Sequence, residues 1–168
     1  MKRIISAISA ILLLFSVSFA CAEDEIDGYG VLGESYEMGK GSVKLVAYYV
    51  DQVNSSKAIF LVFEFTNNGE ETSSFWDEAW YYIHQEDEEL YVVLAEDPRL
   101  NPYVEYCEPG ATVRLTDAYY LYDLKGEVKI ELFRTDQLCQ NHISEVFYRL
   151  DIANEPKAIG EGYKWEDL

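Results

Sequence analysis

Residues 43–50 read VKLVAYYV and residues 59–65 read IFLVFEF, and in both stretches every second side chain is apolar. Such alternation is typical of a β-strand with one buried face. The side chains expected on the buried faces are Val43, Leu45, Ala47 and Tyr49 in the first stretch and Ile59, Leu61, Phe63 and Phe65 in the second. Phe60 and Val62 occupy the opposite face of the second stretch, which predicts a strand covered on both sides at its middle.

The same alternation recurs along the rest of the chain. The further segments are 79–84, 89–94, 113–121, 128–132 and 146–152. Residues 85–88 (QEDE) predict a four-residue acidic hairpin loop between the first two of these. About seven short strands with turn residues between them predict an all-β fold, an immunoglobulin-like antiparallel β-sandwich.

The connections suggest one domain over residues 35–152. Asn67-Asn68-Gly69 predicts a turn that uses the left-handed backbone region. The connection from Ala95 to Glu108 contains Pro98 and Pro102, which exclude a regular helix. Residues 23–34 form an acidic leader expected to be flexible, and the C-terminal tail, 153–168, lacks alternation and is expected to be extended or disordered.

The first 22 residues have the pattern of a secretory signal peptide. Lys2 and Arg3 precede an uncharged run, and small residues surround Cys21. A run of about 16 residues is short for the roughly 20 that span a bilayer. We therefore expect export from the cytoplasm.

Two cleavage interpretations remain open around Cys21. Ala20-Cys21-Ala22 fits ordinary signal peptidase, which would release a chain beginning at Glu23. Ala20-Cys21 also fits a bacterial lipoprotein signal, although Ser18 and Phe19 depart from that pattern. The sequence favours release, and contact with a membrane is expected only if Cys21 is lipidated.

The chain is strongly acidic, with 31 Asp and Glu against 13 Lys and Arg. Removal of residues 1–22 takes Lys2 and Arg3 and no acid, so the formal charge moves from −18 to −20. Such a charge repels phosphate backbones and opposes self-association. We expect no nucleic-acid partner and a monomer.

Two cysteines remain after Cys21, namely Cys107 and Cys139. In an exported chain they could form a disulfide, and the alternative is two separate buried thiols. Cys139 and His142 have the spacing of half a zinc site, but no second pair completes the shell. The sequence thus predicts no metal and no cofactor.

Catalytic motifs are absent from the sequence. No nucleophile elbow, zinc-protease helix motif or phosphate-binding loop occurs. Asp77, Glu78 and His84 are the one set from which a hydrolase could be built, but in so acidic a chain two neighbouring carboxylates are expected by chance. We expect the protein not to be an enzyme.

Aromatic density is the feature that most favours ligand recognition. Trp76, Trp80, Tyr81 and Tyr82 lie close together, and a second group consists of Tyr103, Tyr106, Tyr119, Tyr120 and Tyr122. Because neighbouring residues of a strand point to opposite faces, some of these rings should point outward, where they could stack on sugars or anchor a protein. The alternative is that they fill the core.

Several segments resemble a known family. Residues 63–68 (FEFTNN) precede an acidic turn, residues 108–113 (EPGATV) lead into a strand, and residues 128–132 read VKIEL. Together they resemble a family of secreted bacterial domains of unknown function, over roughly residues 35–152. The resemblance implies a branch of the immunoglobulin-like sandwiches that includes the immunoprotective extracellular antigen of mycobacteria, and it implies export without an assigned reaction.

These observations lead to one main functional prediction. We expect a secreted or surface-tethered, non-catalytic binding module whose partner is a protein or a cell-surface component. A carbohydrate-binding module that uses the rings from Trp76 to Tyr82 is the first alternative. A hydrolase that uses Asp77, Glu78 and His84 is the second.

Overall fold

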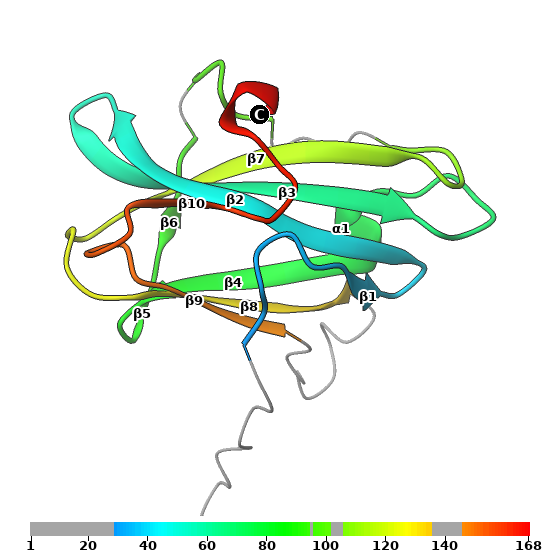
Figure 1. Cartoon of the computed structure of the whole chain (residues 1–168), viewed down its shortest axis with the longest axis horizontal. Coiled ribbons are helices and arrows are strands. Elements are labelled where there is room, and N and C mark those ends of the chain that lie inside the picture. The colour runs from blue at the N-terminus through cyan, green and yellow to red at the C-terminus, as the bar shows by residue number, and fades with distance from the viewer. Residues whose placement is uncertain (1–28, 95, 102–105, 136–145) are drawn as a thin grey trace, which may run out of the picture.

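Two antiparallel β-sheets face each other across one hydrophobic core (Figure 1). The computed structural model describes residues 29–94, 96–101, 106–135 and 146–168. The larger sheet contains β1 (Tyr36–Met38), β2 (Gly41–Val53), β3 (Ser56–Asn67), β6 (Tyr91–Val92), β7 (Thr112–Tyr120) and β10 (Lys157–Ile159). The smaller sheet contains β4 (Ala79–Gln85), β5 (Glu88–Glu89), β8 (Val128–Arg134) and β9 (Val146–Leu150). A one-turn helix, α1 (Phe75–Glu78), precedes β4, and a 3-10 turn spans Trp165–Asp167.

The strand order is that of an immunoglobulin constant-type domain. In the larger sheet β2, β3, β7 and β6 are neighbours in the order of strands A, B, E and D. In the smaller sheet β4, β8 and β9 have the order of strands C, F and G. The predicted all-β antiparallel sandwich is therefore confirmed, and β1, β5 and β10 are short additions to it.

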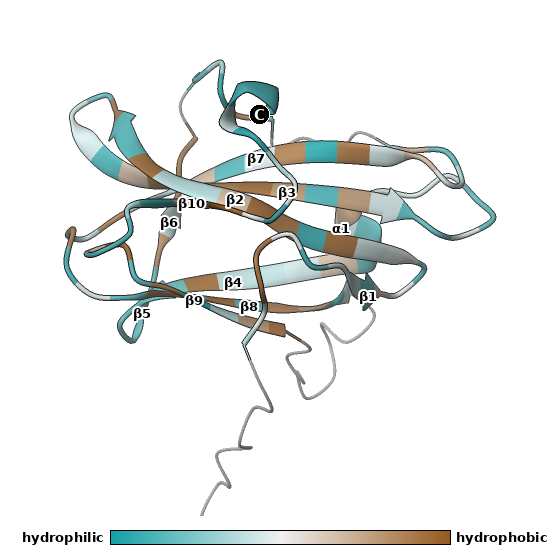
Figure 2. Ribbon diagram, viewed as in Figure 1, coloured by the Kyte–Doolittle hydropathy of each residue, from teal (hydrophilic) through white to brown (hydrophobic). Residues whose placement is uncertain are grey.

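β3 is buried on both faces, as its sequence predicts. Ile59, Leu61, Phe63 and Phe65 contribute to the main core between the sheets. Phe60 and Val62 lie on the outer face, each in a smaller apolar cluster. Hydrophobic residues accordingly dominate this strand in Figure 2.

β2 departs from the predicted alternation at its middle. The register with β3 shifts between Leu45 and Ala47, so Val46 forms a β-bulge. Val43 and Leu45 face the main core as predicted, but beyond the bulge Tyr48 takes the core position. Ala47 and Tyr49, predicted on the core face, instead lie on the outer face, because one extra residue reverses the alternation.

Asn67 does not form the predicted left-handed turn. Among the described residues only Asn54 and Glu86 have positive φ without being glycine, and Gly69 is not left-handed either. Asn67 is completely buried, its side-chain amide donates to Glu71 O (2.8 Å) and Cys107 O (2.9 Å), and its Oδ1 accepts from Gly69 N (2.9 Å). The residue thus joins two loops by hydrogen bonds.

The predicted strand 89–94 is divided between the two sheets. Gln85 pairs with Glu88, so the hairpin loop has two residues, Glu86 and Asp87, rather than the predicted four. Leu90 is buried in the main core, and the chain there passes from the smaller sheet to the larger. Burial of Leu90 explains the crossing, because a continued hairpin would carry the chain away from the core.

The two segments that flank the predicted domain are attached to it. In the C-terminal tail, expected to be extended or disordered, β10 pairs with β2, and Tyr163 Oη donates to Glu64 Oε2 (2.6 Å). Ile159 and Tyr163 cover Val46 and Val62 on the outer face of the larger sheet. In the described part of the leader, the amide of Gly30 donates to Phe147 O (2.6 Å) and that of Gly33 to Leu45 O (2.9 Å).

Candidate functional site

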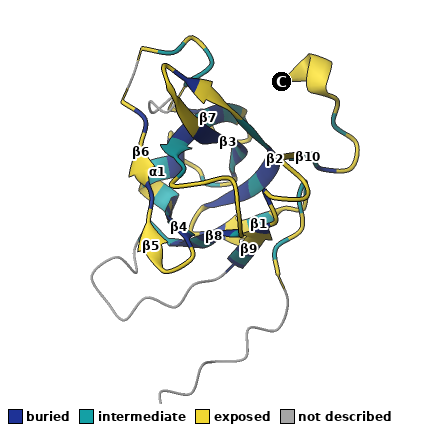
Figure 3. Cartoon of the chain, turned by 90° about the vertical axis from the view of Figure 1, so that its left-hand side faces the viewer, coloured by how far each residue is buried: buried dark blue, intermediate teal, exposed yellow. Residues whose placement is uncertain are grey.

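A groove of about 610 Å³ lies on the side of the sandwich where β4 and β6 face each other. It is lined by Trp80, Tyr81, Tyr82, Ile83, Glu88, Glu89, Leu90, Tyr91, Val92, Tyr119 and Tyr122. Figure 3 looks at this side of the molecule, with exposed β5 and β6 toward the viewer. Three of the four predicted ligand-binding residues, Trp80, Tyr81 and Tyr82, are therefore groove residues.

The groove follows the edge of β4. Four consecutive residues, 80–83, line it although alternate side chains of a strand point to opposite faces. Consecutive residues can line one hollow only where the edge of the strand itself forms the wall. β8 occupies the other edge of β4 along its whole length, from Ala79 to Gln85.

Three of the side chains that line the groove are large, exposed aromatic rings. Tyr91 in β6 is 73% exposed and Tyr122 after β7 is 51% exposed, while Trp80 in β4 is 37% exposed. Tyr122 is anchored, because its hydroxyl donates to Glu89 O (2.8 Å). Large exposed rings that converge on one hollow are typical of binding surfaces.

A buried carboxylate stands behind the groove. Asp117 in β7 is only 3% exposed, and its Oδ2 accepts from the hydroxyls of Tyr81 (2.8 Å) and Tyr119 (3.1 Å). The two hydroxyls are 3.0 Å apart, and Asp117 Oδ1 accepts from the amide of Ala118 (2.9 Å). Because Tyr81 and Tyr119 also line the groove, this network holds two of its rings in fixed positions.

Burial alters the acidity of all three groups. Removal from water raises the pKa of Asp117, and the hydrogen bonds from Tyr81, Ala118 and Tyr119 oppose this only in part. Burial, together with the nearby Asp117 carboxylate, also raises the pKa of Tyr119 and that of Tyr81. Both phenols therefore stay protonated and act as hydrogen-bond donors.

One end of the groove is acidic. Glu88 and Glu89 line it, and an adjoining hollow of about 310 Å³ is lined by Gln85, Glu86, Asp87, Glu88, Tyr122 and Asp123. The two hollows share Glu88 and Tyr122. Among the described residues, no lysine, arginine or histidine lines either hollow. A positively charged group would thus meet carboxylates without competition from the protein's own cations.

Trp76, the fourth predicted residue, lies beside the groove rather than in its lining. It is half-buried in α1 and packs against Trp80 (ring centroids 5.1 Å apart) and Tyr81 (5.8 Å). Its ring therefore supports two groove residues from behind. Of the four predicted residues, Trp80 exposes its ring on the surface, as is expected of an outward-pointing ring. The ring of Tyr81 faces the core instead.

The structure does not bring together the set considered for hydrolysis. Asp77 Oδ2 accepts from Ser74 N (3.1 Å) and Ser74 Oγ (2.7 Å), which caps α1. Glu78 accepts from Lys40 N (2.7 Å) and Ser73 Oγ (2.8 Å). His84 lies near the far end of β4, five residues beyond Ala79, which corresponds to about 16 Å along an extended strand. The two carboxylates hold local structure, and His84 packs edge-on against Tyr82 (6.3 Å).

Of the residues considered for a disulfide, lipid attachment or a metal site, the structure describes Cys107. Cys107 is buried, and its backbone exchanges hydrogen bonds with that of Ser73. Cys139, and Cys21 with the whole signal segment, lie outside the described residues, so the disulfide and the lipid attachment stay predictions. Within the described part of the chain no three His, Cys, Asp or Glu side chains are grouped as a metal site would require.

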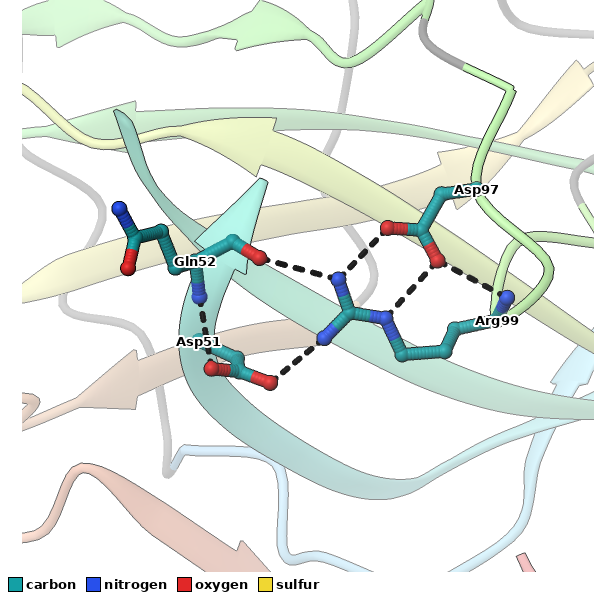
Figure 4. Close-up of polar contacts among 4 residues, drawn as sticks. All are labelled: Asp51, Gln52, Asp97 and Arg99. Carbon is teal, nitrogen blue, oxygen red and sulfur yellow. Dashed lines mark hydrogen bonds and ion pairs between the residues drawn. The ribbon is translucent and has the colours of Figure 1, made fainter. Parts of the chain in front are cut away.

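A second polar cluster surrounds Arg99, on the outer face of the larger sheet (Figure 4). Its guanidinium donates to Asp97 (2.6 and 2.8 Å), Asp51 (2.6 Å) and Gln52 O (3.0 Å), and it lies 4.4 Å from the centre of the Phe60 ring. Hydrogen bonds from Arg99 lower the pKa of Asp97 to about 2. Since internal partners occupy these donors, the cluster fastens residues 97–99 to β2 and is structural.

Comparison with known proteins places the chain in a family. Residues 20–133 match the model of a domain of unknown function, DUF5067. The chain belongs to this family. No curated protein sequence matches this DUF5067 chain.

Two solved structures share the fold of the DUF5067 chain. A "putative lipoprotein" from Staphylococcus aureus has a TM-score of 0.55 and 13% identity, over 75% of this chain and 93% of that one. A "putative lipoprotein (ycdA)" from Bacillus subtilis has a TM-score of 0.50 and 12% identity, over 70% of this chain. The latter match covers 38% of the Bacillus subtilis chain, so the DUF5067 chain spans well under half of its length. At these identities the likeness shows the fold alone.

No helix within the described residues of the DUF5067 chain has the length and apolar character needed to cross a bilayer. The predicted signal segment, 1–22, is outside them.

Sequence reasoning missed half of the groove. Glu89 and Tyr91 are predicted in a hairpin strand beside β4 and Glu88 in its acidic loop, so none of them is expected to face an aromatic wall. The second aromatic group is the signal that could have found the site, because two of its members, Tyr119 and Tyr122, line the groove. Their proximity to Trp80 depends on strand pairing between β6 and β7, which no local pattern reveals.

Proposed function

We propose that this protein is a non-catalytic, extracytoplasmic binding domain and that the groove along β4 is its ligand site. The observation that carries the proposal is the convergence of exposed rings from two sheets, Trp80, Tyr91 and Tyr122, above a rigid floor. A preformed concave surface of this kind binds with little ordering cost. The partner is a protein or a cell-surface component, and the strongly acidic chain is not expected to bind nucleic acid.

Export supports the same proposal. The N-terminal segment has the pattern of a signal peptide, and the two solved structures described above are named putative lipoproteins. The protein works outside the cytoplasmic membrane, either released after Ala22 or held by a lipid on Cys21. The relation to the immunoprotective antigen sandwiches belongs to this proposal as well, supported by the shared immunoglobulin-type strand order.

Binding to immobilised glycans and peptides tests the proposal. The wild-type chain is compared with Tyr91→Ala and Tyr122→Ala, and Tyr106→Ala is the matched control, because Tyr106 is exposed but lines neither hollow. We expect ligands whose binding weakens at least tenfold in the two groove variants and stays unchanged in the control. Ligands that bind all four proteins equally would contradict the groove as the site.

Carbohydrate binding is the second candidate, favoured by the combination of exposed rings with Glu88 and Glu89 in one groove. Aromatic faces stack on sugar rings and carboxylates accept hydrogen bonds from sugar hydroxyls. Groove-dependent signals confined to glycans, with none on peptides, would favour this candidate over a protein partner.

A further inference from the structure

We infer that the ligand of this groove is an extended peptide segment that carries lysine or arginine and pairs with the open edge of β4. The inference rests on the proposed function and names its ligand class. Two independent observations carry it: unpaired backbone groups along the groove, and carboxylates at one end.

The backbone observation concerns the N–H and C=O of Tyr81 in β4, the residue two before Ile83 on the same edge of the strand. β5 pairs only with His84 and Gln85, and the last bond on this edge is from Leu90 N to Ile83 O (2.9 Å). In the described part of the chain no other backbone pairs with this edge before Ile83 apart from the cap bond of Ala79 N to Phe75 O. Among the described residues, no backbone group therefore pairs with the N–H and C=O of Tyr81 where β4 borders the groove.

The direction of the free backbone groups follows from strand geometry. Backbone N–H and C=O groups of one residue point to the same side of a strand, and residues two apart point the same way. Since Ile83 O points toward β5, the N–H and C=O of Tyr81 point into the groove. An added strand of about three residues, roughly 10 Å long, can exchange hydrogen bonds with them.

The open edge is unprotected by the usual devices. Proteins commonly guard such edges with lysine, proline or a bulge. Residues 79–82 read AWYY, with none of these. An edge that borders an aromatic groove and lacks protection fits strand addition by a ligand.

The charge observation defines the side chains of the ligand. Glu88 and Glu89 lie in the groove, and Glu86, Asp87 and Asp123 lie in the adjoining hollow, with no basic residue in either lining. The exposed rings of Tyr91, Tyr122 and Trp80 provide faces on which a guanidinium or ammonium group is attracted. The formal charge of −18 for the whole chain attracts the same partner from a distance. A basic extended segment is thus complementary to the groove in shape and in charge.

Four fluorescent nine-residue peptides test the inference by polarisation. One alternates lysine with threonine and valine, the second replaces lysine by glutamate, the third replaces it by glutamine, and the fourth is the lysine peptide with N-methylated backbone at alternate residues. We expect binding of the first peptide, at least tenfold weaker binding of the others, and a several-fold loss between 50 and 300 mM salt (about one or two released counterions).

Variants of the protein assign the binding to the groove. Glu88→Gln with Glu89→Gln is expected to weaken the lysine peptide at least fivefold. Glu70→Gln with Glu71→Gln is the matched control, because it removes the same charge from exposed residues of the loop after β3 that line neither hollow. An equal loss in both variants would show attraction by overall charge alone and overturn the inference.

The remaining outcomes separate the inference from the proposed function. Equal binding of the glutamate and lysine peptides would overturn the charge preference, and equal binding of the N-methylated peptide would overturn strand pairing. No peptide binding, with glycan binding that depends on Tyr91 and Tyr122, would overturn the inference and leave the proposed function supported. A concentration-dependent dimer that competes with the peptide would replace the partner by a second copy of this chain, which also overturns it.

Discussion

Asp117 is a carboxylate buried between the sheets beside apolar and aromatic side chains, and its environment determines a pH dependence. Burial raises its pKa above the ordinary value of 3.8. The folded state therefore binds the proton more readily than the unfolded chain does. The contribution of this group to the free energy of unfolding increases as the pH falls from neutral through its folded pKa, and it levels off below 3.8.

Asp117→Asn is expected to remove this pH dependence, because the amide does not titrate. The difference in free energy of unfolding, wild type minus variant, should become more favourable to the wild type between pH 7 and pH 4.5. Urea unfolding at several pH values measures it, and Asp87→Asn at the exposed hairpin tip gives the background for losing one carboxylate. A difference that is the same at all pH values would contradict the prediction.

Asn67 illustrates a second residue whose role is structural. Asn67→Ala removes one buried acceptor and two donated hydrogen bonds, and it leaves the carbonyl of Cys107 without this donor. We expect a loss of about 2–4 kcal/mol in the free energy of unfolding.

The neighbouring Asn68 supplies the control for Asn67. It is exposed, and its side chain donates one long bond to Glu37 (3.3 Å), so Asn68→Ala should change the free energy of unfolding by about 0.5 kcal/mol or less. Similar losses in both variants, measured by chemical unfolding, would show that Asn67 has no special role.

At the scale of elements, β10 and the turn that follows it seal the outer face of the larger sheet. Ile159 and Tyr163 pack over Val46 and Val62. Glu64 fastens the same region, since it accepts from Tyr163 (2.6 Å) and from Arg114 (2.7 Å), which also donates to Asp167 O (2.6 Å). Burial alone would raise the pKa of Glu64, but these two hydrogen bonds outweigh it and lower the pKa.

Truncation after Pro156 is therefore expected to destabilise the domain rather than trim a tail. It exposes Val46 and Val62 and unpairs β2 from β10, with an expected cost of about 3 kcal/mol. Chemical unfolding and binding of a dye specific for exposed apolar surface measure the effect. Trp165→Ala removes a ring that packs edge-on against Tyr49 (6.0 Å) but leaves β10 and Tyr163 in place, so it should cost less than half as much. An unchanged unfolding midpoint in the truncated chain would refute the prediction.

At the scale of the whole molecule, a formal charge of −18 opposes association between copies of the chain. The proposed export has two routes, release after Ala22 and attachment of a lipid to Cys21, and a lipid there would not alter the fold.

Localisation of the wild type and of Cys21→Ser distinguishes the two routes of export. We expect both proteins in the soluble extracytoplasmic fraction, with a mature N-terminus at Glu23 by mass spectrometry, because Ser18 and Phe19 depart from a lipoprotein signal. Wild type in the membrane fraction, with Cys21→Ser released, would establish lipid attachment instead.

The sequence by itself determined the fold class and most of the strands, because alternation is a local property that burial of one strand face imposes. It also drew attention to Trp80, Tyr81 and Tyr82, which line the groove, since a dense aromatic group is visible without any pairing. It failed at Val46 and at Leu90, where a bulge and a crossing between sheets depend on distant partners. It failed likewise at the tail, whose three-residue strand is stabilised by β2 rather than by its own pattern. Only the tertiary structure placed Tyr91, Tyr119 and Tyr122 in one groove with residues of β4, because strand pairing joins residues far apart in the chain.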